Sequence, residues 1–147
     1  EEEELAAPEL EYALDVMRCM RRREVFYLPA PDFLDLQPEL NARMRSVLTG
    51  WLGEVRRKYR LRKETLFLSV SIVDRYLSRV LVPRNRFQLV GVTALLIASK
   101  LEEIHAPGLA DLEYVTQHSC SVRDIMASEA LMLAALEYEV AAPTAAH

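Results

Sequence analysis

The side chains that could do chemistry are spread along the chain without a catalytic or metal-binding pattern. The two cysteines, Cys19 and Cys120, lie far apart, and no histidine stands at zinc-ligand spacing from either. His105 and His118 have no second ligand nearby, so the sequence predicts no bound metal and no cofactor. There is also no glycine-rich phosphate loop and no Ser/His/Asp or Cys/His arrangement. We therefore expect a protein that is not an enzyme.

One apolar stripe has the spacing of a continuous helix face. Met44, Val47, Leu48 and Trp51 recur at i, i+3, i+4 and i+7, which places them on one side of a helix. Glu54 follows three residues after Trp51. Such a stripe normally faces the core of a domain. On the residues alone, the core-facing interpretation is favoured.

The elements that position these residues are all predicted to be helices. Every periodic segment has its apolar residues at helical spacing, and none alternates like a half-buried strand. Pro29 and Pro31 break the chain, Pro38 suits the first turn of a new helix, and Ser121 with Asp124 resembles a capping box. The expected helices are Pro8–Arg23, Pro38–Lys58, Arg62–Val80, Pro83–Glu103, Gly108–Gln117 and Ser121–Leu136, and a linker, Tyr27–Gln37, precedes the second.

The fourth predicted helix determines the architecture. From Leu89 to Ala98 it reads LVGVTALLIA, which is apolar on every face, so neighbouring helices must cover it all round. Gly91, Ala94 and Ala98 are small and allow those neighbours to come close. We therefore expect an all-α fold in which four helices wrap a buried central helix, with the N-terminal helix packed outside.

The composition fits one ordinary domain. The chain has 147 residues, of which 51% are hydrophobic and 27% are charged. A formal charge of -4 gives no reason to expect nucleic acid as a partner. No stretch reaches the ~18 apolar residues of a membrane span, and the opening glutamates do not resemble a signal peptide. These features, with the separated cysteines, predict a soluble intracellular domain without a membrane partner, in the nucleus and/or cytoplasm.

Four segments in register resemble a known family. In their order and spacing they are closely similar to the cyclin box of the A/B-type cyclins, over about Pro38 to Thr144. The resemblance implies a five-helix cyclin box around a buried central helix. Residues 1–37 are then an N-terminal helix with a proline-containing linker, and 38–147 are the N-terminal cyclin box, with the second cyclin repeat expected to be absent from this chain. The segments are MRSVLTGWLGEV at Met44–Val55, VDRYL at Val73–Leu77, FQLVGVTALLIASKLEE at Phe87–Glu103 and LEYEVAAPT at Leu136–Thr144.

The resemblance also implies a function. Cyclins have no catalytic residues; they bind and activate a cyclin-dependent Ser/Thr protein kinase in cell-cycle control, by placing the regulatory helix whose glutamate pairs with the active-site lysine. Lys100 and Glu129 match the family's pair that hydrogen-bonds the kinase backbone. From the residues alone they would be an ordinary surface pair. The matching apolar positions, which would otherwise be assigned to the core, are Ile97, Leu101, Leu133 and Val140.

The same resemblance changes the interpretation of the apolar stripe. In A-type cyclins this helix face is an exposed groove that receives Arg-x-Leu peptides of substrates and inhibitors, and Glu54 is expected on its rim, where it could meet the peptide's arginine. Arg45 and Asp74 match an ion pair that ties the second helix to the third, although two exposed charges are the alternative. The expected groove residues are Met44, Val47, Leu48, Trp51, Glu54, Phe87 and Gln88.

A function of a different class stays open. Some proteins with this fold are adaptors that recruit ligands without activating a kinase, and the groove alone would suffice for such recruitment. Lys100 and Glu129 favour the activator, because an adaptor has no need of them.

Overall fold

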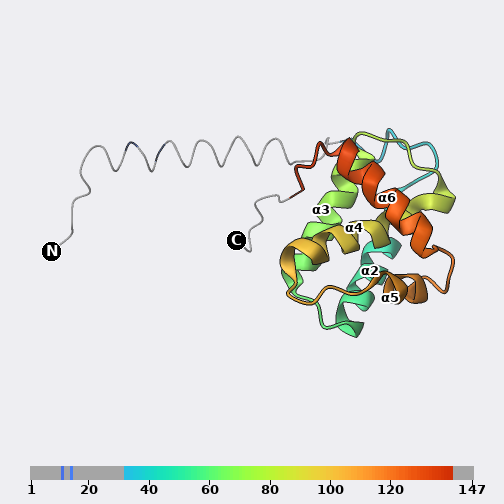
Figure 1. Ribbon diagram of the computed structural model, residues 1–147. Helices are drawn as coiled ribbons and strands as arrows, with labels where there is room; N and C mark the ends of the chain where they lie inside the picture. Colours follow the sequence, from blue (N-terminus) through green and yellow to red (C-terminus); the bar gives the residue numbers. More distant parts are fainter. Residues whose placement is uncertain (1–10, 12–13, 15–31, 141–147) are drawn as a thin grey trace.

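The computed structural model describes Glu11, Leu14 and residues 32–140 (Figure 1). The predicted N-terminal helix Pro8–Arg23 therefore lies outside the described residues, except for Glu11 and Leu14, which are helical. Between residues 32 and 140 the chain is helical, without a strand, as predicted. No helix that the structure describes is both long and apolar enough to cross a bilayer. The elements are α2 (Ala42–Lys58), α3 (Lys63–Leu77), a 3-10 turn (Arg84–Arg86), α4 (Phe87–Glu102), α5 (Leu109–Val115) and α6 (Val122–Ala135).

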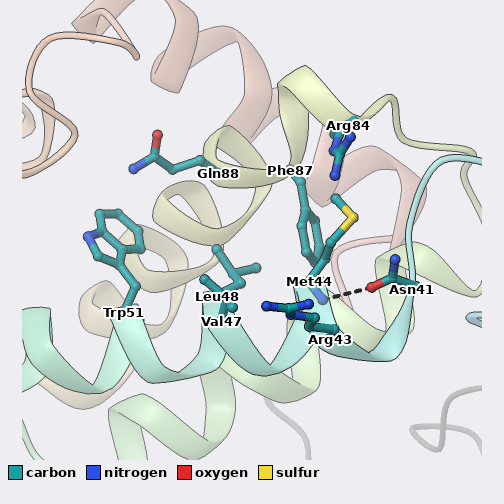
Figure 2. Close-up of a pocket in the computed structure, with 9 residues that line it drawn as sticks. All are labelled: Asn41, Arg43, Met44, Val47, Leu48, Trp51, Arg84, Phe87 and Gln88. Atoms are coloured by element: carbon teal, nitrogen blue, oxygen red, sulfur yellow. Dashed lines mark hydrogen bonds between the residues drawn. The ribbon is translucent and has the colours of Figure 1, made fainter.

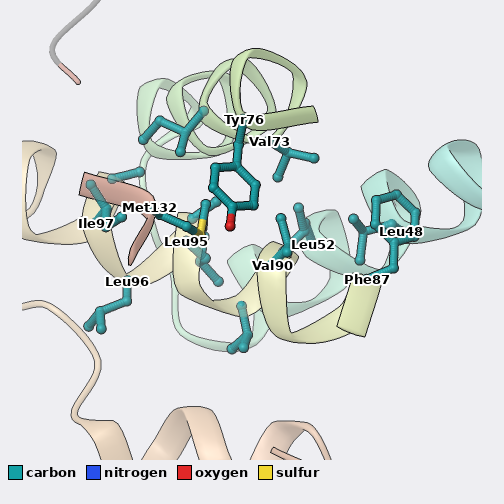
Figure 3. Packing of buried hydrophobic residues seen from close by; sticks show 14 of the residues in the cluster. Leu48, Leu52, Val73, Tyr76, Phe87, Val90, Leu95, Leu96, Ile97 and Met132 are labelled. Carbon is teal, nitrogen blue, oxygen red and sulfur yellow. The ribbon is translucent and has the colours of Figure 1, made fainter. Parts of the chain in front are cut away.

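Helix α4 is the buried centre of the bundle. It packs against α2, α3 and α6 (Figure 1), and every residue from Val90 to Ser99 is buried. Figure 3 shows side chains from α2, α3 and α6 gathered around Leu95. The prediction of a central helix covered on all sides is confirmed, because a helix without a polar face has no side that it can turn to water.

The contact between α2 and α4 depends on a glycine. A Cβ atom on Gly91 would lie only 2.7 Å from Cδ1 of Leu48, which is closer than two carbon atoms can pack. The small residue predicted to allow a close approach therefore does so at this crossing. As a result, the buried Leu48 is held directly against the axis of α4.

The start of α2 differs from the prediction. Pro38 was expected in its first turn, but residues 38 and 39 form a turn and the helix begins at Ala42. Asn41 is the N-cap, and its side-chain oxygen accepts a hydrogen bond from the Met44 amide at 2.9 Å. Asparagine is among the best N-cap residues because it satisfies an amide that has no partner within the helix. The start of the helix is therefore set by the Asn41 cap and not by Pro38.

A buried glutamine explains why the preceding linker and the end of α3 meet. The Gln37 amide donates to the carbonyl oxygens of Leu77 at 2.8 Å and Val80 at 2.7 Å, and its oxygen accepts from the Val82 amide at 3.0 Å. These bonds satisfy one backbone group at the last residue of α3 and two just beyond it. Helix α3 therefore ends three residues earlier than the predicted Val80.

The capping box predicted for the last helix is confirmed. The Ser121 hydroxyl accepts from the Asp124 amide at 3.1 Å, and the Asp124 carboxylate accepts from the Ser121 amide at 3.3 Å. Reciprocal bonds of this kind set the first turn of a helix locally. Accordingly, α6 begins at the residue after Ser121 and ends one residue before the predicted Leu136.

Glu103, at the end of α4, caps a different helix. One of its carboxylate oxygens accepts from the Arg62 amide and from the Thr65 hydroxyl, both at 2.6 Å. A negative charge at the first turn of α3 also complements the positive end of its dipole. This carboxylate thus joins the C-terminus of the central helix to the N-terminus of α3.

We expect Glu103→Gln to lower the free energy of unfolding by about 1 kcal/mol, because it removes the charge from a helix cap while keeping its shape. Urea unfolding followed by circular dichroism measures the change. Glu137→Gln, at an exposed position after α6, is the matched control and should be neutral. Equal losses in the two variants would show that Glu103 does not act as a cap.

Candidate functional site

One candidate site is an exposed ion pair between two helices. Lys100 lies in the last turn of α4 and Glu129 lies within α6. The Lys100 ammonium is 2.8 and 3.1 Å from the two carboxylate oxygens, and the side chains are 56% and 21% exposed, respectively. A lysine ammonium has three N–H donors and two are used here, so one remains for an approaching acceptor. The pair can offer a directional polar contact at the surface.

The apolar residues predicted beside this pair fall into two groups. Leu101 is 50% exposed and Leu133 is half-buried, so both are accessible. Ile97 and Val140 are buried within this chain. A partner that binds this surface would therefore contact Leu101 and Leu133.

The structure adds a residue that the sequence analysis missed. Ile104 follows the end of α4 and is 94% exposed, which is unusual for a large apolar side chain. It lies in the loop between α4 and α5, three residues after Leu101. The signal available in the sequence was an isolated apolar residue directly after Glu102 and Glu103. Leu101 and Ile104 extend the accessible apolar surface near Lys100.

The ion pair expected between α2 and α3 is present. Arg45 Nε donates to Asp74 Oδ1 at 2.9 Å and Nη2 donates to Oδ2 at 2.7 Å, a two-pronged arrangement. The hydrogen bond to Asp74 raises the pKa of Arg45. Charge-assisted bonds with this geometry are among the strongest in proteins, and they orient both helices. The pair fixes the N-terminal half of α2 against α3.

A groove of about 580 Å³ runs between α2 and the start of α4 (Figure 2). Leu48 and Phe87 are buried, Met44 and Trp51 are half-buried, and Val47 is 68% exposed. The stripe on α2 therefore has one edge in the core and the other at the surface. A surface of this kind suits an apolar side chain of a peptide ligand.

Glu54 does not line this groove. It lies in a neighbouring pocket of about 480 Å³ together with Lys58 and His118, and Trp51 lines both cavities. Gln88 lines the groove from the α4 side, and its side-chain oxygen accepts a hydrogen bond from the Ser119 hydroxyl at 3.0 Å. A ligand that reaches Glu54 from the groove must therefore pass over the indole of Trp51.

Three polar groove residues were missed by the sequence analysis: Asn41, Arg43 and Arg84 also line the cavity. Arg43 precedes Val47 by four residues, so helical periodicity could have placed both on one face. Arg84 belongs to the 3-10 turn before α4 and reaches the groove from a different element. No spacing rule within one helix could have found it.

The one cysteine among the described residues is inert by its surroundings. Cys120 is buried, and burial raises the pKa of its thiol. A thiol in an apolar environment stays protonated and is a poor nucleophile. Cys19 lies outside the described residues. Cys120 is therefore a packing residue between α5 and α6.

The helix arrangement defines an all-helical bundle with two candidate functional surfaces. The family description "Cyclin, N-terminal domain" matches residues 15–141, and the chain belongs to the cyclin family. It is similar to G2/mitotic-specific cyclin-B of Emericella nidulans, with 44% identity over 90% of this chain and 28% of that protein. Cyclin-A2 of Xenopus laevis is 39% identical over 91% of this chain and 32% of that protein.

A solved structure supports the same fold. The viral cyclin from herpesvirus saimiri superposes with a TM-score of 0.76 at 25% identity, covering 86% of this chain and 56% of that one. The five-helix cyclin box is therefore the architecture of residues 32–140. The chain spans about a third of the length of the cyclins that it resembles in sequence.

Proposed function

We propose that this chain is the N-terminal cyclin box of a regulatory subunit that binds and activates a cyclin-dependent Ser/Thr protein kinase in cell-cycle control. The observation that carries the proposal is the exposed Lys100–Glu129 pair, flanked by the accessible Leu101 and Leu133. The mitotic names of similar cyclins agree with this role. In this proposal residues 1–37 are the N-terminal helix and linker, and 38–147 are the box.

The physical basis of activation is selective binding. A protein–protein interface with an apolar centre still needs a few polar contacts to fix its register, and the lysine–glutamate pair can provide them. A kinase needs its regulatory helix in place before its lysine–glutamate pair forms. A partner that binds only this arrangement shifts the kinase population toward it, and a change from 1:99 to 99:1 requires about 10⁴-fold preference. The chain itself would perform no catalysis and would need no cofactor.

Substrate recruitment is the second part of the proposal. The groove between α2 and α4 has an apolar floor for the leucine of an Arg-x-Leu peptide, and Glu54 lies beyond Trp51 for the arginine. The partners are then a cyclin-dependent kinase together with substrates or inhibitors that carry this motif, and neither nucleic acid nor a membrane is needed. Such a protein would work in the nucleus and/or cytoplasm.

We expect the purified chain to co-elute with at least one member of a panel of cyclin-dependent kinases in size-exclusion chromatography. The mixture should phosphorylate a basic peptide faster than the kinase alone, and the chain alone should not phosphorylate it. A stable complex of this kind buries on the order of 2,000 Å² or more. If no kinase of the panel co-elutes with the chain, the activator proposal is wrong.

The adaptor remains the second candidate. The observation that favours it is that the groove is already formed in the chain alone, with Leu48 held in place by its close contact with α4 at Gly91. Recruitment through such a surface needs no contribution from Lys100. The two candidates are separated by exchanging the charges of the pair, with Lys100→Glu and Glu129→Lys combined in one chain.

A further inference from the structure

We propose that the groove and the neighbouring pocket that holds Glu54 together recognise charges on one ligand, and that they prefer a peptide whose basic residue is followed, about five positions later, by an acidic residue. This inference rests on the proposed recruitment of Arg-x-Leu peptides. It adds a second recognition element, formed by Arg43 and Arg84, for a carboxylate or a phosphate.

The two arginines lie at one end of the groove. Arg43 comes from the first turn of α2 and Arg84 from the 3-10 turn on the other wall, and both line the cavity. Figure 2 shows them on either side of Met44 and Phe87, with Trp51 at the far end. Both side chains are exposed, and no ion pair is formed by either within the part of the chain that the structure describes.

Beyond the opposite end of the groove, in the neighbouring pocket, Glu54 supplies a negative charge in line with Arg43. Glu54 follows Arg43 by eleven residues, which is just over three full turns of α2, so the two lie on nearly the same face. At 1.5 Å per residue they are about 16 Å apart along the axis. Val47, the exposed groove residue, lies between them on the same face. The surface along α2 therefore has positive charge in the groove, at the start of the helix, and a carboxylate about two turns beyond Val47, in the neighbouring pocket that Glu54 shares with Lys58.

The distance between Arg43 and Glu54 predicts how far apart the two charged residues of the peptide should be. An extended peptide advances about 3.3 Å per residue, so a 16 Å span corresponds to about five residues. If the arginine of an Arg-x-Leu motif meets Glu54 and the leucine enters the groove, the chain continues toward Arg43 and Arg84. The acidic residue should then stand about three positions after the leucine.

The chemistry of the arginines determines what they select. A guanidinium binds carboxylate and phosphate oxygens with paired N–H donors, and two guanidiniums favour the larger charge of a phosphate. Because both side chains are exposed, water and salt screen the attraction, and each contact is weak. The arginines therefore contribute discrimination among peptides that already bind through their apolar residue. A lysine at the same peptide position would be repelled, which adds to specificity.

We would measure the binding of fluorescent peptides to the 147-residue chain by polarisation. Four peptides share one Arg-x-Leu core and differ only at the third residue after the leucine, which is serine, glutamate, phosphoserine or lysine. The glutamate peptide should bind about two- to fivefold more tightly than the serine peptide, as expected for exposed charge pairs. The phosphoserine peptide should bind at least as tightly as the glutamate peptide, and the lysine peptide more weakly than the serine peptide. High salt should reduce all of these differences.

The double variant Arg43→Gln/Arg84→Gln should bring the affinity ratio of the glutamate and serine peptides to about one. Arg57→Gln/Arg123→Gln removes the same charge from exposed positions that do not line the groove, and it should keep the ratio. Equal binding of the serine and glutamate peptides to the unmodified chain would overturn the charge proposal alone, provided that a leucine-to-alanine core peptide binds more weakly. Failure of all four peptides would overturn recruitment and this inference together. Self-association of the chain in sedimentation at these concentrations would assign the face to a second copy and would also overturn it.

Discussion

A chain in which Lys100→Glu and Glu129→Lys are combined should fold normally but should no longer bind the kinase. The exchange keeps one positive and one negative group at the same surface, so a pair that is now 2.8 Å apart can form again with its direction reversed. Exposed pairs contribute at most about 1 kcal/mol to stability, so the melting temperature should hardly change. The donor and acceptor offered to the kinase backbone are interchanged, however. Losses on breaking buried charged contacts at interfaces are about 2–5 kcal/mol, or roughly 30- to several thousand-fold in affinity.

Kinase affinity is measured by biolayer interferometry with the kinase immobilised. Asn85→Glu is the control, because Asn85 is exposed in the 3-10 turn that precedes α4, and the length of α4 between Phe87 and Lys100 alone is about 20 Å. It should leave kinase affinity unchanged. The Arg-x-Leu peptide should bind the exchanged chain as it binds the original. If kinase binding also survives the exchange, the pair has no part in docking, and the adaptor becomes the better description.

Helix α4 connects the two candidate surfaces. Phe87 and Gln88, in its first turn, line the groove, and Lys100 lies in its last turn. The helix is buried on all sides between these ends, so it cannot bend or tilt without disturbing the whole core. A substrate held in the groove would therefore be kept at a nearly constant distance from a kinase bound at Lys100. A rigid helical bundle can in this way fix the distance between two bound partners.

The part of the fold that could be predicted is the part that depends on hydrophobicity. A ten-residue apolar run, Leu89 to Ala98, has only one stable place in a helical protein, and the structure puts it there. The capping box at Ser121 is equally local and was predictable for that reason. The start of α2 and the end of α3 were predicted at the wrong residues. Asn41 and Gln37 form hydrogen bonds with backbone groups there, and hydrophobic periodicity carries no information about such bonds.

The candidate site shows the same division. Met44, Val47, Leu48 and Trp51 could be placed on one helix face, but periodicity alone could not say which of them would be covered. Burial depends on what α4 brings to the same place: Leu48 is pressed against Gly91, while Val47 remains exposed. Arg84 entered the groove from a separate element, and Ile97 proved to be covered where the nearby Leu101 is accessible. Such facts depend on tertiary contacts between segments far apart in sequence.

Breaking the Arg45–Asp74 pair should be the most damaging single change to the support of the groove. Asp74 is almost buried, and Arg45 gives it two hydrogen bonds at 2.9 and 2.7 Å. Replacing one partner leaves the other desolvated and uncompensated, which costs about 3–5 kcal/mol for fully buried pairs. Because the Arg45 side chain is still 31% exposed, we expect Asp74→Ala to lower the free energy of unfolding by about 2–4 kcal/mol.

A double-mutant cycle in urea separates the ion pair from packing. Arg45→Met and Asp74→Ala should each destabilise the chain, and the double variant should lose clearly less than the sum, with a coupling of about 1–3 kcal/mol. Glu64→Ala, which breaks the more exposed contact with Arg62 at 3.4 Å, is the control and should cost less than about 1 kcal/mol. Because Arg45 holds the turn of α2 that carries Met44, each single variant should also lower the affinity of the chain for the Arg-x-Leu peptide. Strict additivity in the cycle would mean that the two charges stabilise the fold independently and that the pair does not position the groove.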